Sequence, residues 1–122
     1  MRKIYLYILL VFAISCNEKS GQTDNEISEK INSSNTNQIV TGYYYIGEEE
    51  KTKFIPNIFE NPTDARISHS MEYKGISVYQ SKMIAMKKIS GLPAPNSINS
   101  TPDSLVIKFY YDWAIKNNYI KK

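Results

Sequence analysis

The sequence predicts an α+β fold for residues 38–122, in which a small antiparallel sheet carries two helices. Two observations indicate strands: a run rich in β-branched and aromatic residues, and a segment in which apolar and polar side chains alternate. A third observation indicates helices, because two later segments place apolar residues three and four positions apart between recognisable caps. We expect a signal peptide over residues 1–15 and a lipidated cysteine with a flexible tether over residues 16–37 to precede this domain.

Two segments are expected to form the main strands. Ile39–Ile46 (IVTGYYYI) lacks proline and is rich in residues that favour extended backbone. Arg66–Tyr73 (RISHSMEY) alternates with a period of two, so that Ile67 and Met71 would share a buried face. Phe54–Phe59 (FIPNIF) is expected to be a short extended piece at an edge, because its proline has no N–H to donate to a neighbouring strand.

The first expected helix covers Val78–Ile89. Ser77, followed three residues later by Gln80, resembles a capping box, in which each side chain satisfies a backbone N–H of the first turn. Gly91 suits the left-handed position that closes a helix, and the proline two residues later prevents continuation. These signals predict both ends of the helix.

The second expected helix begins at Thr101-Pro102-Asp103, which combines a hydroxyl cap, a proline and an acid in the first turn. Leu105, Phe109 and Trp113 recur at four-residue steps and predict its buried stripe, which Val106 and Tyr110 extend. The stretch TPDSLVIKFYYDWAIKNN, residues 101–118, resembles the opening helix of small NTF2-like envelope proteins. In that family such a helix precedes a curved sheet, so the resemblance would make this chain a truncated remnant. No functional residue is carried over from it.

The amino terminus carries an export signal. Two basic residues, Arg2 and Lys3, precede the apolar run Ile4–Ile14, which is far shorter than the roughly 20 residues of a membrane-spanning helix. The run ends in Ala13-Ile14-Ser15-Cys16, which resembles the lipobox of bacterial lipoproteins, where small residues precede a cysteine that becomes the new N-terminus. An ordinary secretory signal that happens to contain a cysteine, or an uncleaved anchor, is the alternative.

The lipobox resemblance implies a lipid anchor on Cys16, in the outer or inner membrane of a bacterial cell envelope. A thiol suits this chemistry because part of it is already thiolate near neutral pH. Several acyl chains, each burying methylenes at ~0.8 kcal/mol apiece, would make the attachment long-lived. Asn17–Asn37 is rich in Ser, Asn, Glu and Lys, and its only strongly apolar residues are Ile27 and Ile31. This composition predicts a flexible tether between the lipid and the domain.

The charge balance gives no support for a nucleic-acid partner. The chain has 15 Lys and Arg against 12 Asp and Glu, and removal of the signal peptide would leave it close to neutral. Acids dominate up to Asp64 and bases dominate after it. Either the two halves attract each other within one fold, or a basic face meets an acidic partner or anionic head groups.

Few side chains are suited to catalysis or to holding a metal. His69 is the only histidine and Cys16 the only cysteine. Glu48, Glu49 and Glu50 are adjacent and would repel, so a solvated turn suits them better than a calcium loop. There is no nucleophile elbow and no phosphate-binding glycine loop. We therefore expect no catalytic residue, no metal site and no cofactor, with a small hydrolase using His69 as the enzymatic alternative.

The tyrosines indicate a binding role. Tyr44 and Tyr111 are expected on the outer faces of their elements, where a rigid ring with a polar tip favours contact with a protein or a sugar. The sequence therefore predicts an envelope lipoprotein that acts as a binding or accessory module toward another envelope protein or a polysaccharide. An immunity or inhibitor lipoprotein directed against a toxin or lytic enzyme is the alternative.

Overall fold

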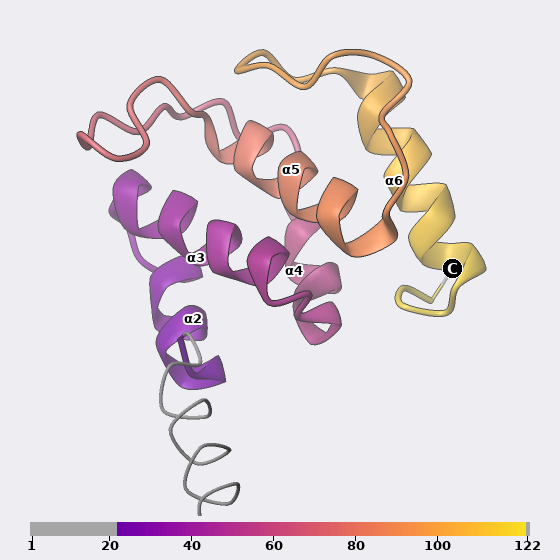
Figure 1. The fold of residues 1–122 in the computed structure, drawn as a ribbon, viewed down its shortest axis with the longest axis horizontal. Helices are drawn as coiled ribbons and strands as arrows, with labels where there is room; N and C mark the ends of the chain where they lie inside the picture. Colours follow the sequence, from indigo (N-terminus) through magenta and orange to yellow (C-terminus); the bar gives the residue numbers. More distant parts are fainter. Residues whose placement is uncertain (1–21, 122) are drawn as a thin grey trace, which may run out of the picture.

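The structure, a computed structural model, describes residues 22–121, and these form a group of helices joined by loops (Figure 1). In chain order the elements are α2 (Asp24–Ile31), α3 (Thr36–Glu48), the short 3-10 helix η1 (Thr52–Phe54), α4 (Ile55–Ile58), α5 (Val78–Ser90) and α6 (Ser104–Lys116). Residues 22–121 contain no β-strand, and their one strand-like pairing is an isolated bridge between Ile67 and Ser77. The expected α+β fold with an antiparallel sheet is therefore wrong.

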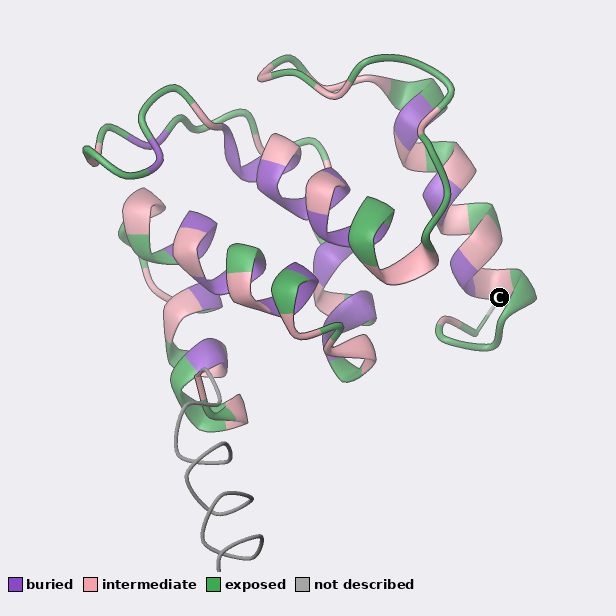
Figure 2. Cartoon of the chain, in the orientation of Figure 1, coloured by how far each residue is buried: buried purple, intermediate pink, exposed green. Residues whose placement is uncertain are grey.

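Helices α3 and α5 lie side by side at the centre of the described part, with α2 packed on α3 and α6 packed on α5 (Figure 1). Figure 2 shows the buried positions gathered on the facing sides of these helices. The largest side chains with no more than 1% exposure are Tyr79, Tyr110, Ile27, Ile46, Ile55, Ile58, Met83, Met86, Val40, Val78 and Val106. None of the described helices has the length and apolar composition needed to cross a lipid bilayer.

Residues 39–46, which were expected to form a strand, lie in the middle of α3. The Asn35 side chain caps this helix by accepting hydrogen bonds from two backbone amides of the first turn. Ile39, Tyr43 and Ile46 are at most 4% exposed and share one helical face. In a strand Ile39 and Ile46 would point to opposite sides, because they are an odd number of positions apart. Burial of one continuous face therefore overrides the β propensity of the segment.

The segment that was expected to be a flexible tether contains α2. Thr23 and Glu26 form a capping box, in which the Thr23 hydroxyl accepts from the Glu26 amide at 3.2 Å. Ile27 and Ile31, four positions apart, are buried against α3. The tether interpretation is therefore wrong for residues 24–31. The signal peptide and Cys16 lie outside the described residues.

The alternating segment 66–73 forms a loop instead of a strand. Its burial does not follow the expected alternation: Ile67 is 40% and Met71 96% exposed, whereas Ser68 is fully buried. The Ser68 hydroxyl donates to the Asn37 side-chain oxygen on α3 at 2.7 Å. A polar contact thus anchors this segment, which an argument from apolar alternation does not anticipate.

The expected extended piece Phe54–Phe59 is helical as well. It forms η1 and α4, and Pro56 occupies the first turn of α4, where a missing N–H removes no helical hydrogen bond. Phe54, Ile55 and Ile58 are buried by this turn. Pro56 is therefore compatible with a helix in this segment, because it stands in the first turn.

Both helices expected in the second half are confirmed. The Ser77 hydroxyl caps α5 by accepting from the Gln80 amide at 3.0 Å, and Gly91 closes it with a φ of 71°. In α6 the capping side chain is Asp103, not Thr101. Only part of the expected buried stripe of α6 is fully buried, because Leu105 is 61% exposed. Its fully buried positions are Val106, Tyr110 and Ala114. Apolar residues form two adjacent stripes on this helix, and packing selects the second.

Candidate functional site: an open groove and a buried lysine

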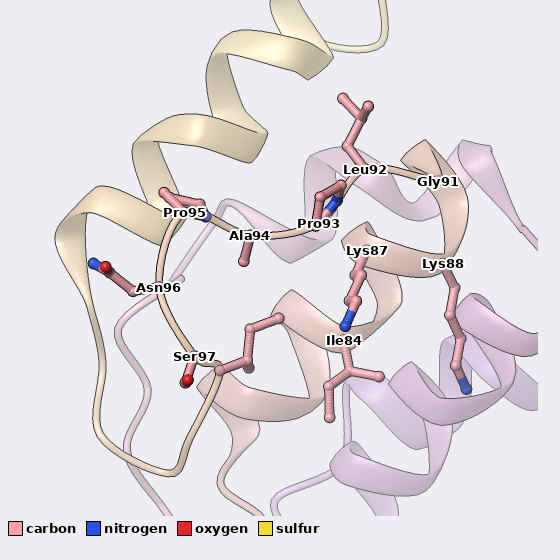
Figure 3. Close-up of a pocket in the computed structure, with 11 residues that line it drawn as sticks. Ile84, Lys87, Lys88, Gly91, Leu92, Pro93, Ala94, Pro95, Asn96 and Ser97 are labelled. Carbon is pink, nitrogen blue, oxygen red and sulfur yellow. The ribbon is translucent and has the colours of Figure 1, made fainter.

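A hollow of about 1050 Å³ opens between the last turns of α5 and the loop that follows it (Figure 3). We call it the loop groove. It is lined by Ile84, Lys87 and Lys88 of α5 and by residues 91–98 of the loop. Figure 3 shows the loop arching over this end of α5, with Ile84 and Lys87 between the two. The groove is therefore built by segments that are adjacent in the sequence.

The lining of the loop groove combines aliphatic and polar side chains and contains no aromatic side chain. Its polar side chains are those of Lys87, Lys88, Asn96 and Ser97. Lys88 is occupied elsewhere, because it pairs with Glu48 of α3. Lys87 is exposed and makes no ion pair with any acid of residues 22–121. Within the described part of the chain, the groove thus presents one uncompensated positive charge beside apolar walls.

Helix α6 holds the loop in place from behind. The Tyr110 hydroxyl donates to the Leu92 carbonyl oxygen at 2.9 Å, and the Asn96 side-chain amide donates to the Asp103 carboxylate at 3.0 Å. Pro93 and Pro95 fix two backbone dihedrals between these contacts. Hydrogen bonds with α6 and its N-cap residue therefore fix the loop at two points.

The two tyrosines that the sequence singled out lie in different surroundings. Tyr44 is 39% exposed, with its ring 5.1 Å from the Lys88 Nζ and 5.6 Å from the ring of Tyr73. Tyr111 is half-buried, with its ring edge-on to that of Phe59 at 5.4 Å. No ring contact among the described residues joins Tyr44 to Tyr111, and neither residue lines the loop groove. Each of the two tyrosines therefore packs against its own aromatic neighbour, and neither contributes to the loop groove.

A second hollow, of about 150 Å³, contains Lys82 of α5. Only 4% of Lys82 is exposed. Its Nζ donates to the Asn61 carbonyl oxygen at 2.9 Å and lies 5.2 Å from the centre of the Tyr43 ring. Burial lowers the pKa of Lys82 to about 8, although Asp64 and Glu60 oppose that shift. We call this hollow the lysine pocket.

The acids near the lysine pocket are held apart from the amine. The Asp64 carboxylate forms an ion pair with the Arg66 guanidinium, with an Nη2 to Oδ2 distance of 2.6 Å. These hydrogen bonds keep the pKa of Asp64 below its usual value. Glu60 also lines the pocket, but its side chain reaches solvent and makes no ion pair within residues 22–121. The Lys82 amine therefore has a carbonyl as its hydrogen-bonding partner and no carboxylate.

The sequence contained a signal for this lysine that composition and motif patterns do not detect. Lys82 follows Tyr79 by three positions and precedes Met86 by four, so it belongs to the apolar stripe of α5. A lysine within such a stripe is either buried or displaces the helix. His69, by contrast, is exposed, although its place in an alternating segment would have put it on the buried face of a strand. Residues 22–121 contain no cluster of three or more His, Cys, Asp or Glu side chains that could hold a metal ion.

No family model matches the chain, and neither a curated protein nor a solved structure matches it. The loop groove, the lysine pocket and the sequence of residues 1–16 are therefore the features that bear on function.

Proposed function

We propose that this protein is a lipoprotein of a bacterial cell envelope, attached to a membrane through acyl chains on Cys16, and that it acts by binding a segment of another envelope protein in the loop groove. The observation that carries the binding role is an open groove of about 1050 Å³ that has aliphatic side chains in its walls and Lys87 at its side. The attachment rests on the resemblance of Ala13-Ile14-Ser15-Cys16 to a lipobox.

The lining of the loop groove favours a polypeptide over a polysaccharide. Sugar rings are bound by aromatic faces and by dense arrays of hydrogen-bonding side chains, and the groove has no aromatic lining residue. Its walls are formed instead by Ile84, Ile98, Ala94 and two prolines, which suit an apolar side chain of a partner. Pockets that bury such anchors carry most of the energy in protein interfaces.

Charge narrows the class of partner further. Lys87 adds a positive charge at the groove that no acid of residues 22–121 neutralises. A segment that carries an aspartate or glutamate next to its apolar anchor would therefore complement both features. Charges of this kind speed association and select between partners more than they add to affinity.

The attachment is tested by the mass of the mature N-terminal peptide and by cell fractionation. We expect acylation of Cys16 and recovery of the protein with membranes. Cys16→Ser should remain unprocessed or lose the lipid mass. An unmodified Cys16 in the wild-type protein would contradict the proposal.

The binding role is tested by photocrosslinking in cells. A photoreactive amino acid replaces Ser97, which lines the loop groove, or Asn25, an exposed residue of α2 that serves as the control position. We expect a discrete adduct from position 97 that Lys87→Glu abolishes. Lys74→Glu is the matched variant, because Lys74 is also exposed, makes no ion pair within residues 22–121 and lies outside the groove.

Identical adducts from both positions, or an adduct that Lys87→Glu leaves unchanged, would contradict the proposal. The identity of the crosslinked protein separates the two binding roles that the sequence predicted. A resident envelope protein supports the accessory role. An incoming toxin or lytic enzyme instead assigns the groove to an inhibitor.

A further inference from the structure

The lysine pocket has a combination of features that the binding role does not use. Lys82 is 96% buried in a helix, since only 4% of it is exposed, and yet it is among the residues that line a hollow of about 150 Å³. An ammonium group has three N–H donors, and a single hydrogen bond from Lys82, to the Asn61 carbonyl oxygen, occurs within residues 22–121. The amine is thus positioned at an accessible space with donors to spare.

The charges around the pocket indicate what kind of molecule it suits. Lys82 and Arg66 contribute two positive charges, and Asp64 and Glu60 contribute two negative ones. Because these charges balance, an anion or a cation would gain little by entering. The pocket lining also includes the asparagines 32, 57 and 61. A small, uncharged and polar molecule is therefore the favoured occupant.

The amine is also chemically competent. Burial lowers the pKa of Lys82 to about 8, and the neighbours that face it are Tyr43 on α3 and Glu60, Asp64 and Arg66 after α4. At pH 7 about a tenth of such amines are neutral, against well under a thousandth for an ordinary lysine. Desolvated lysines of this kind react as nucleophiles with carbonyl compounds.

We propose that Lys82 is a covalent capture site for short hydroxyaldehydes that enter the lysine pocket. The neutral Nζ attacks the aldehyde carbon and forms a C–N bond, while the carbonyl π pair moves to oxygen and is protonated. One Nζ proton replaces the one taken up by this oxygen, and the other leaves together with the hydroxyl as water to give an imine. One aldehyde and one amine thus yield one imine and one water, with no oxidant or reductant.

The size of the pocket limits the aldehyde. A hollow of about 150 Å³ is well below the roughly 300–1,000 Å³ of pockets that hold drug-sized ligands, so it favours an aldehyde with few non-hydrogen atoms. Glycolaldehyde fits this limit, and its hydroxyl can bond to the asparagine-rich wall. Pyridoxal does not fit. The capture site is independent of the loop groove, because the two hollows share no lining residue.

The test compares lysines within one molecule of the purified full-length protein. The protein is incubated with glycolaldehyde at pH 7, the imine is trapped with cyanoborohydride, and the rate of modification at each lysine is read by peptide mass spectrometry. We expect Lys82 to react more than tenfold faster than the exposed Lys87 and Lys74, with a rate that saturates with aldehyde concentration. The rate at Lys82 should rise with pH and level off above pH 8.

Three controls make the result decisive. In urea the rates at all lysines should converge, because the pocket is lost. Pyridoxal should show no preference for Lys82. Lys82→Arg, which keeps the charge, should remove only the fast site. Modification of Lys82 at the rate of exposed lysines or more slowly, or equal preference for pyridoxal, would overturn the proposal, and neither outcome depends on a variant that must fold.

Discussion

Gly47 of α3 lies so close to α5 that no side chain fits between the two helices. A Cβ atom at Gly47 would be 2.9 Å from the Cα of Ala85, which is shorter than real carbon contacts. Gly42, one and a half turns earlier, relates α3 to α2 in the same way, because its Cβ would be 2.6 Å from the Cγ2 of Ile31. Two glycines therefore set the distances at which α3 packs against both of its neighbours.

The first prediction concerns this approach. Gly47→Ala should lower the free energy of unfolding by about 1–3 kcal/mol, because α5 must move or strain. Alanine is intrinsically better than glycine in a helix by about 1 kcal/mol, so the sign of the effect is informative. Urea unfolding followed by circular dichroism measures it. Gln38→Ala, on the exposed side of α3, is the control and should be nearly neutral. A more stable Gly47→Ala protein would contradict the close packing.

The second prediction separates two buried tyrosines. Tyr79 and Tyr110 are both 0% exposed. The Tyr110 hydroxyl bonds to Leu92 at 2.9 Å, whereas the Tyr79 hydroxyl has no hydrogen-bonding partner of ordinary geometry among the described residues. Tyr110→Phe should therefore cost about 1–3 kcal/mol by leaving a carbonyl unpaired, and Tyr79→Phe should be neutral or stabilising. Thermal unfolding of the two variants decides this, and equal losses would refute the assignment.

The third prediction tests whether α2 belongs to the core. Ile27→Ala should destabilise the protein by about 2–5 kcal/mol, because Ile27 is fully buried. Glu29→Ala, on the exposed side of the same helix, should change stability by less than about 0.5 kcal/mol. Urea midpoints of both variants provide the comparison. If Ile27→Ala were as harmless as Glu29→Ala, the tether interpretation of this segment would be restored.

The fourth prediction concerns pH. The pKa of Lys82 is about 8 in the folded protein, against 10.5 for an unperturbed lysine such as that of the unfolded chain. The unfolded chain therefore keeps this proton up to a higher pH than the folded protein does. The free-energy cost of burying the charged Lys82 amine is therefore fully present below pH 8. It disappears as pH rises from 8 toward 10.5, because the amine is then neutral in the folded protein. Tyrosines oppose this at higher pH: burial raises the pKa of Tyr110 and of Tyr73 from 10.0 to about 12, so the unfolded phenols ionise first and stability falls above pH 10.

In the window between these effects, the free energy of unfolding should rise by about 1–2 kcal/mol from pH 7 to about pH 9.5. Lys82→Met should flatten that rise and be at least as stable as wild type at pH 7, because it removes a buried charge that has no carboxylate partner. Urea titrations of both proteins at several pH values give the two slopes. Parallel slopes would show that Lys82 is not the group responsible.

Local signals in the sequence were sufficient for α5 and nearly so for α6. Ser77 and Gly91 act through hydrogen bonds and dihedrals within a few residues, so their effect does not depend on distant parts of the chain. For α6 the same kind of signal placed the helix, but the buried side depended on which of two apolar stripes met α5. The lipid attachment at Cys16 is likewise a local pattern, and it stays a prediction.

Tertiary structure decided the rest. The residues around Tyr43 are apolar enough for a strand or a helix. They form α3 because α2 and α5 together bury one face of that helix. Gly42 and Gly47 allow this close packing, because they have no side chain. Helix α2 is too short and has too few apolar residues to be stable alone. Packing of its two isoleucines against α3 stabilises it. The position of Lys82 in the lysine pocket also depends on tertiary packing, because Lys82 lies on the face of α5 that the rest of the protein buries. Helix caps depend on residues a few positions apart, so the sequence alone determines them. Which helix face is buried depends on the element packed against it, and only the tertiary structure determines that.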